Sequence, residues 1–240
     1  MADDTQRLAV LIDADNAPAS IVDALFDEIA SLGEASIRRI YGDFSGTRQK
    51  GWQGVLNRHA INAVQTFNYT TGKNASDIAL VIDGMDMLHQ GRIDGFCLVS
   101  SDSDFTRLAS RAREQGMMVY GFGAEKTPEA FRNACNRFIY IENLVVSKRE
   151  SDEAPTAGKN APQSRKSAGD AVPLIRKAMD QMGDDDGWYN LGILGQTLGK
   201  LYPDFDPRTY GNAKLSTLVR KTGAFADRKG ADGAIEISPK

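Results

Sequence analysis

The stretch LAVLIDADN, residues 8–16, decides how the first part of the chain is interpreted. Its first five residues, 8–12, are all apolar and predict a strand that is buried on both faces, as is typical of a parallel sheet. Acidic residues and an asparagine follow this strand directly. Ligands bind parallel sheets at the carboxyl ends of the strands, so one stretch predicts both a fold class and the position of a site.

Strand and helix patterns alternate downstream of this stretch. Further strands are predicted over residues 35–41, 63–67, 95–100 and 117–122. Helices are predicted over residues 18–32 and 74–89, after Phe105, and from Thr127 and Pro128 onward. In the helix over 74–89 the buried stripe is expected to consist of Ile78, Val81, Ile82 and Met85. The alternation predicts an α/β fold, a parallel sheet with helices on both faces.

Composition excludes several classes of protein. Hydrophobic residues make up 41% and charged residues 25% of the 240 residues, which is typical of a globular chain rather than a disordered one. No apolar run reaches the ~18 residues of a membrane span, and the first seven residues do not form a secretory signal. Cys97 and Cys135 lack the spacing of a zinc site or a disulfide framework. We therefore expect a cytoplasmic protein with reduced thiols and no membrane partner.

A stretch poor in large apolar residues divides the chain. Residues 147–170 are rich in Ala, Ser, Pro, Gly and charge, so they cannot bury enough apolar area to offset their ordering entropy. We predict a flexible linker there, between a first domain over residues 1–146 and a second over residues 171–240.

Acidic residues gather where the predicted strands of the first domain end. Asp13 follows the first strand, Asp102 and Asp104 follow the strand over 95–100, and Asp77 lies in the first turn of the helix over 74–89. Converging carboxylates repel one another unless they bind protons or share a cation. Oxygen ligands without His or Cys favour Mg²⁺ or Mn²⁺, which can activate a water against a phosphodiester. Asn16 is suited to orient that water or a phosphate.

Each of these acids also has a purely structural interpretation. Acidic residues are common N-caps, and Asp77 suits a helix N-terminus through the helix dipole alone. The three segments together favour a metal site over three independent caps. We leave Asp15 out of the metal set, and Asp83 lies off the helix face of Asp77, so we expect Asp83 to be solvated or structural.

The first domain resembles the NYN family, a branch of the PIN-like nucleases. The matching residues are Asp13-Ala14-Asp15-Asn16, Lys73 through Asp77 with Ile78-Ala79-Leu80, Ser101-Asp102-Ser103-Asp104-Phe105 and Gly121-Phe122-Gly123. The resemblance covers essentially all of residues 5–146. It implies a PIN-like, metal-dependent ribonuclease with the catalytic set Asp13, Asn16, Asp77, Asp102 and Asp104, of which the four aspartates would hold the metal. PIN-like domains often dimerise, which leaves a homodimer open.

Cationic residues near the acids are candidates for RNA contacts. Arg48, Lys50 and Trp52 follow a glycine-containing loop, and such a group can bind single-stranded RNA through phosphate contacts and base stacking. Lys73, just before Asp77, is expected to handle substrate or charge. The alternative for Trp52 is that it belongs to the apolar side of a helix together with Val55 and Leu56.

The second domain reads as three helices followed by a two-stranded wing. Helices are predicted over residues 172–182, 188–201 and 211–222, and strands over 225–227 and 234–237. The segment resembles an OST-HTH domain, also called LOTUS, through Asp186-Gly187-Trp188, Pro203 to Gly211 and Lys214-Leu215. This winged-helix resemblance implies RNA binding or docking of a protein partner. Lys214, Arg220 and Lys221 are the candidates for phosphate contacts, with ordinary surface charge as the alternative.

Together these features predict an Mg²⁺- or Mn²⁺-dependent ribonuclease that is tethered to an RNA-binding or targeting domain. Two alternatives remain at this stage. One is a non-catalytic RNA-binding regulator. The other is a phosphatase of the haloacid dehalogenase type, because Asp13 and Asp15 imitate its two aspartates; Ala17 and the lack of an obvious partner lysine disfavour it.

Overall fold

The computed structural model describes residues 5–46, 49–67, 74–144, 166–183, 187–230 and 233–240. The chain forms two compact units, residues 1–154 and residues 155–240, each described here by itself. Most of the predicted linker lies outside the described residues. The described part of the second unit begins at Lys166, earlier than the predicted boundary at 171, and a capping box between Ser167 and Asp170 starts its first helical turn.

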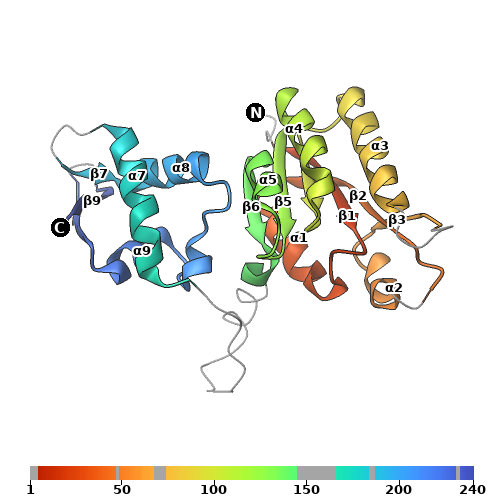
Figure 1. The fold of residues 1–240 in the computed structure, drawn as a ribbon, viewed down its shortest axis with the longest axis horizontal. Helices are drawn as coiled ribbons and strands as arrows, with labels where there is room; N and C mark the ends of the chain where they lie inside the picture. Colours follow the sequence, from red (N-terminus) through yellow and green to blue (C-terminus); the bar gives the residue numbers. More distant parts are fainter. Residues whose placement is uncertain (1–4, 47–48, 68–73, 145–165, 184–186, 231–232) are drawn as a thin grey trace, which may run out of the picture. The chain divides into compact units, whose positions relative to one another are not determined.

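A six-stranded parallel sheet forms the centre of the first unit (Figure 1). Its strands are β1 (Arg7–Asp13), β2 (Glu34–Gly42), β3 (Asn62–Gln65), β4 (Gly95–Val99), β5 (Met118–Gly123) and β6 (Arg137–Tyr140). They lie in the order β3-β2-β1-β4-β5-β6. The predicted α/β fold with a parallel sheet is confirmed. The edge strand β6 was not among the predicted strands.

The direction in which strands are added reverses between β1 and β4. The chain builds outward from β1 through β2 to β3, and α3 (Ala75–Gln90) then carries it back across the sheet to β4 on the other side of β1. Ile12 of β1 is paired with Val99 of β4, so these two strands end side by side. This reversal is the place where open α/β sheets bind ligands.

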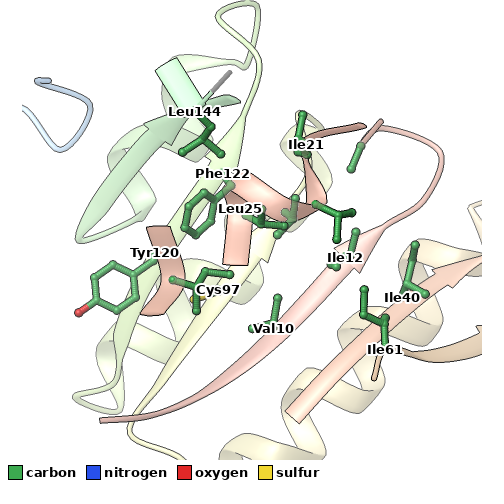
Figure 2. Packing of buried hydrophobic residues seen from close by; sticks show 14 of the residues in the cluster. Val10, Ile12, Ile21, Leu25, Ile40, Ile61, Cys97, Tyr120, Phe122 and Leu144 are labelled. Atoms are coloured by element: carbon green, nitrogen blue, oxygen red, sulfur yellow. The ribbon is translucent and has the colours of Figure 1, made fainter. Parts of the chain in front are cut away.

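Helices cover both faces of the sheet. One face packs against the short 3₁₀ turn Ala19–Ile21, α1 (Val22–Ala30) and α2 (Lys50–Leu56), and Figure 2 shows this core around Val10, Ile12 and Leu25. The other face packs against α3, α4 (Thr106–Glu114) and α5 (Glu129–Ala134). Residues 8, 10 and 12 of β1 face the first layer and residues 9 and 11 face the second, as strand alternation requires. The continuous apolar run is therefore explained by burial on both sides.

The inward face of α3 differs from the predicted one. Its buried residues are Ser76, Leu80, Gly84 and Met87. Ile78 and Ile82, two members of the predicted stripe, are 60% and 56% exposed. A Cβ atom at position 84 would lie only 3.1 Å from Leu108 Cδ2. Gly84 therefore allows the helix to pack closely on α4 and the sheet, and this packing leaves Ile78 and Ile82 exposed.

A polar group joins α3 to β2. Asp83 accepts a hydrogen bond from Tyr41 Oη at 2.9 Å and forms an ion pair with Arg39 Nη1 at 2.5 Å. Burial, followed by the bond to this carboxylate, raises the pKa of Tyr41 far above its ordinary value. Asp83 therefore has the structural role that the sequence indicated, away from the face of Asp77.

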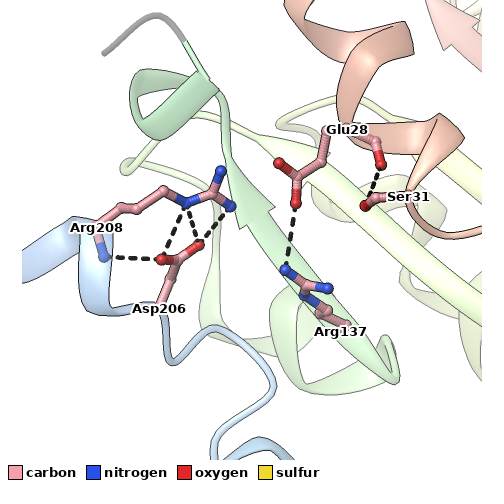
Figure 3. A network of polar contacts seen from close by, with 5 residues as sticks. All are labelled: Glu28, Ser31, Arg137, Asp206 and Arg208. Atoms are coloured by element: carbon pink, nitrogen blue, oxygen red, sulfur yellow. Dashed lines mark hydrogen bonds and ion pairs between the residues drawn. The ribbon is translucent and has the colours of Figure 1, made fainter. Parts of the chain in front are cut away.

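A second polar contact fixes β6 against α1, on the other side of the sheet. Arg137 Nη2 lies 3.2 Å from Glu28 Oε1, and Ser31 Oγ donates to the Glu28 carbonyl at 2.7 Å (Figure 3).

None of the helices in the described parts of the chain combines the length and apolar character needed to cross a membrane.

The second unit is a small helical domain with a three-stranded antiparallel sheet. After the 3₁₀ turn Ala168–Ala171 come α7 (Val172–Met182), β7 (Tyr189–Asn190), α8 (Leu191–Leu201), the 3₁₀ turn Pro207–Tyr210, α9 (Leu215–Thr222), β8 (Phe225–Lys229) and β9 (Ile235–Pro239). The strands lie in the order β7-β9-β8. The helix predicted over 188–201 begins only at Leu191 because Asn190 caps it and pairs with β9. The helix predicted over 211–222 likewise begins at Leu215.

The loop before α9 is held by a local ion pair. Arg208 places its Nε and Nη2 atoms within 3.1 Å of the Asp206 carboxylate, and its backbone N–H donates to the same group at 2.8 Å (Figure 3). The Asp206 side chain is nearly buried, so these bonds satisfy a charge that water does not reach well.

The packing of α3 predicts opposite effects of the same substitution at two helical glycines. Gly84→Leu should lower the free energy of unfolding by about 1–3 kcal/mol, because the new side chain has no room beside Leu108 and Leu11. Gly54→Leu in α2 should be neutral or stabilising by up to about 1 kcal/mol, since a Cβ there meets no described atom within 4 Å. Urea unfolding of the full chain checks both. Equal stability of the two variants would contradict the described packing.

Candidate metal centre

Three carboxylates meet at the reversal point of the sheet. Asp77 lies in the first turn of α3, Asp102 follows β4, and Asp104 lies in the short 3₁₀ turn Ser103–Phe105 that leads into α4. One oxygen of each carboxylate lies within 4.8 Å of an oxygen of the other two. The sequence therefore placed these three acids together correctly, although they come from segments that are far apart in the chain.

Local hydrogen bonds explain how these acids are positioned. Asp102 is the N-cap of the 3₁₀ turn, and its carboxylate accepts from the Asp104 backbone N–H at 2.9 Å. Asn74 Nδ2 donates to Asp104 Oδ2 at 2.8 Å and so connects the start of α3 to the turn. The capping interpretation of Asp102 is correct, and the same residue still presents a carboxylate to the cluster.

Asp13, the fourth predicted acid, lies beside this cluster and is engaged differently. It is 1% exposed and accepts hydrogen bonds from the Asp15 backbone N–H at 3.0 Å, Asn16 Nδ2 at 2.8 Å and Ser100 Oγ at 2.7 Å. Its carboxylate is not one of the three that meet within 4.8 Å. Burial raises the pKa of Asp13, and its hydrogen bonds oppose that rise.

The cluster is electrostatically unfavourable by itself. The pKa of Asp77 is raised to about 6, first because the group is partly buried and then because the charges of Asp13, Asp102 and Asp104 repel its ionised form. A bound cation would remove this repulsion. The donor set fits such an ion, because the grouped ligands are carboxylate oxygens, which suit a hard divalent cation such as Mg²⁺ or Mn²⁺.

Two site residues were not found from the sequence. Ser100 is 2% exposed and links two acids, since it donates to Asp13 and accepts from the Asp102 backbone N–H at 3.0 Å. In the sequence it appears only as the last residue of an apolar strand. Asn74 precedes α3 at a position typical of a cap, and that position was its only signal.

The residues expected to form an RNA platform are placed unevenly. Trp52 is 2% exposed and packs in the core, so its ring is not available to stack on a base, and the alternative apolar-face interpretation is the correct one. Lys50 is exposed at the start of α2. Arg48 and Lys73 lie outside the described residues. Asp15 is exposed and accepts from Gln49 Nε2 at 2.9 Å, which connects the loop after β1 to α2.

The predicted basic face of the second unit is smaller than its charge count indicated. Lys214 and Lys221 are exposed at the two ends of α9. Arg220 Nε is paired with Asp227 at 2.8 Å. In the wing, Arg228 pairs with Glu236 at 2.7 Å and lies 4.1 Å from the centre of the Trp188 ring. Part of the positive charge is therefore engaged inside the domain.

Two solved structures that resemble parts of this chain are of proteins without an assigned function. A protein of unknown function from Vibrio parahaemolyticus matches with a TM-score of 0.50 and 18% identity, over 60% of this chain and 98% of that chain. An uncharacterised protein from Nitrosomonas europaea is 34% identical over 37% of this chain and 89% of that chain, with a TM-score of 0.30. No curated protein matches the chain.

Two family models match the chain in the regions where the two units lie. The NYN domain model matches residues 7–142, more than half of the chain, and the OST-HTH/LOTUS domain model matches residues 162–235. The first range contains the six-stranded sheet and the carboxylate cluster, and the second contains the small helical domain as far as the first residue of β9. The chain therefore belongs to the NYN family of PIN-like, nuclease-type domains and carries an OST-HTH/LOTUS domain, a domain type associated with RNA.

Proposed function

We propose that this protein is an Mg²⁺- or Mn²⁺-dependent endoribonuclease. The observation that supports the proposal is the meeting of the Asp77, Asp102 and Asp104 carboxylates within 4.8 Å at the reversal point of an NYN-type sheet. Gathering these charges lowers the stability of the metal-free chain, since each unit by which a pKa is raised corresponds to about 1.4 kcal/mol. A bound cation would offset the repulsion and could face a phosphodiester, which explains why the carboxylates meet.

In this proposal the three carboxylates hold the divalent cation, with Asp13 beside them. A bound Mg²⁺ or Mn²⁺ would supply positive charge opposite the phosphate oxygens and would lower the pKa of a water molecule. Asp13 holds Asn16 through one amide hydrogen, and Asn16 is exposed. Its remaining amide hydrogen and carbonyl oxygen are suited to orient a phosphate oxygen or a water at the cluster.

The second unit serves in this proposal as the RNA-binding or targeting domain. The match to an OST-HTH/LOTUS domain supports this role, and Lys214 and Lys221 are exposed cations on its helix α9. Tethering such a domain to the first unit raises the local concentration of RNA near the carboxylates.

Cleavage of labelled single-stranded RNA tests the activity. The wild-type chain should cut the RNA in Mn²⁺ or Mg²⁺ and not in EDTA, and Asp102→Asn should lower the rate about 100-fold or more because a carboxylate of the cluster is lost. Asp15→Asn is the matched control, since Asp15 bonds to Gln49 and should leave cleavage nearly unchanged.

Three other outcomes would change the assignment. Binding of RNA by the wild type and by Asp102→Asn, without cleavage by either, would favour a non-catalytic regulator. Undiminished cleavage by Asp102→Asn would contradict the assignment of the carboxylate cluster as the catalytic site. Phosphatase activity that disappears in Asp15→Asn would favour the haloacid dehalogenase alternative.

Partial burial of Asp77 and repulsion within the cluster predict a variant that is more stable than the wild type. The pKa of Asp77 is about 6 in the folded chain against an ordinary value of 3.8, so the folded chain binds a proton more readily between these pH values. Ionised Asp77 therefore lowers stability at pH 7, and this loss disappears as the pH falls below about 4. In EDTA, Asp77→Asn should be about 1–2 kcal/mol more stable at pH 7 and no more stable at pH 4.

Urea unfolding at the two pH values measures this difference. Asp83→Asn provides a contrast, because Asp83 accepts bonds from Arg39 and Tyr41 and its loss should destabilise the chain at pH 7. A wild type that is as stable as Asp77→Asn at pH 7 would show that partial burial and the neighbouring charges do not raise the pKa of Asp77 as described.

Substitutions in the second unit should affect binding rather than chemistry. The double variant Lys214→Gln, Lys221→Gln should raise KM for RNA by about threefold to tenfold with little change in kcat, because two free phosphate contacts are lost. Arg220→Gln is the matched control, since its charge is already paired with Asp227. Steady-state cleavage kinetics separate the two constants. Equal KM values for the wild type, the double variant and Arg220→Gln would show that these lysines do not contact the RNA.

A further inference from the structure

Two exposed isoleucines lie on α3 next to the carboxylate cluster. Ile78 follows Asp77 directly and is 60% exposed, and Ile82 is one helical turn further along at 56% exposed. In the described part of the first unit, Phe67 is the other large apolar side chain with comparable exposure, at 57%. Apolar side chains so placed beside a charged site need an explanation other than core packing.

Arg107 lies in the first turn of α4, three residues after Asp104, and is exposed. It makes no hydrogen bond or ion pair with any residue that the structure describes. The other arginines of this helix are engaged: Arg111 pairs with Glu114 at 3.2 Å, and Arg113 donates to the Asn133 carbonyl at 2.9 Å. A cation that stands three residues after Asp104 and is not engaged in an ion pair is available for an anionic ligand.

These residues lie on two helices that pack side by side on the same face of the sheet (Figure 1). Gly84 brings α3 close to Leu108 of α4, and Asn74 bonds to Asp104 where the two segments begin. An apolar row on α3 and a free cation on α4 therefore both begin at the cluster. We call Ile78, Ile82 and Arg107 the α3–α4 strip.

We propose that single-stranded RNA runs from the carboxylate cluster along the α3–α4 strip, with Arg107 contacting a phosphate next to the cleaved one and the isoleucines packing against a ribose or base. This inference rests on the proposed nuclease function. A single strand presents phosphates and apolar base faces at once, which suits a cation beside an apolar row. In a duplex the bases are stacked inside, so they would not contact the isoleucines.

The charge balance favours the same occupant. The acids of the cluster repel phosphates, so a strand that approaches them needs a cation outside the cluster. Arg107 meets that need without neutralising the acids, since it is not paired with them. A protein partner would use the isoleucines but would not require a free arginine next to the carboxylates.

Cleavage of a short single-stranded RNA by the full chain tests Arg107. Arg107→Gln should raise KM about threefold to fivefold and leave kcat within about twofold, because an exposed phosphate contact is lost. It should also reduce the slope of log affinity against log salt by about 0.7. Arg111→Gln, whose charge is already paired with Glu114, is the matched control and should change neither.

Neutral methylphosphonate groups locate the contacted phosphate. When one replaces that phosphate, the wild type should lose as much affinity as Arg107→Gln loses with unmodified RNA. Arg107→Gln should lose nothing further, because the two changes remove the same interaction. Additive losses at every phosphate next to the cleaved one would overturn the assignment of Arg107.

RNA binding by Asp102→Asn, measured by fluorescence anisotropy, separates this inference from the proposed function. If the wild type does not cleave, the proposed function fails, while a weaker binding of RNA when Arg107→Gln is added still supports the strip. Ile78→Ser with Ile82→Ser should also weaken RNA binding. Unchanged RNA binding together with a changed sedimentation coefficient would overturn the strip and assign the isoleucines to a protein contact.

Discussion

Electrostatic repulsion between carboxylates at the ends of β1 and β4 is the constraint on which the site depends. The reversal of strand order places these ends together, and α3 brings Asp77 to the same point. Hydrogen bonds from Ser100, Asn74 and the backbone hold the acids where they are. The pKa of Asp77 rises to about 6, first because the group is partly buried and then because these charges repel its ionised form, and a bound cation would remove the repulsion.

Most of the fold and of the acidic set followed from the sequence because their signals are local. The apolar run at residues 8–12 could only be a doubly buried strand, and acids directly after parallel strands must share one edge. The contacts that the sequence did not show depend on the approach of distant elements. The face of α3 was mispredicted because Gly84 and Ser76, which carry no apolar signal, allow the helix to pack closely. Ser100 was not found as a site residue, and Trp52 was left between base stacking and core packing, because the burial of both is set by neighbouring strands and helices.

The distribution of charged residues over the two units explains why the net charge of the chain is small. The first unit gathers acids and leaves Arg107 free beside them, while the second keeps Lys214 and Lys221 exposed and pairs Arg220 and Arg228 internally. A net charge of -3 therefore does not exclude an RNA partner, because contacts with phosphate depend on where the free cations lie.

Titration of the metal-free chain with Mn²⁺ in a calorimeter tests the central claim most directly. We predict that the wild type and Asp15→Asn bind Mn²⁺ and that Asp77→Asn and Asp102→Asn do not. At pH 6 binding should release protons, because a cation displaces the proton that Asp77 partly holds. Absence of binding by the wild type, or equal binding by all four proteins, would contradict the claim that these carboxylates form a metal centre.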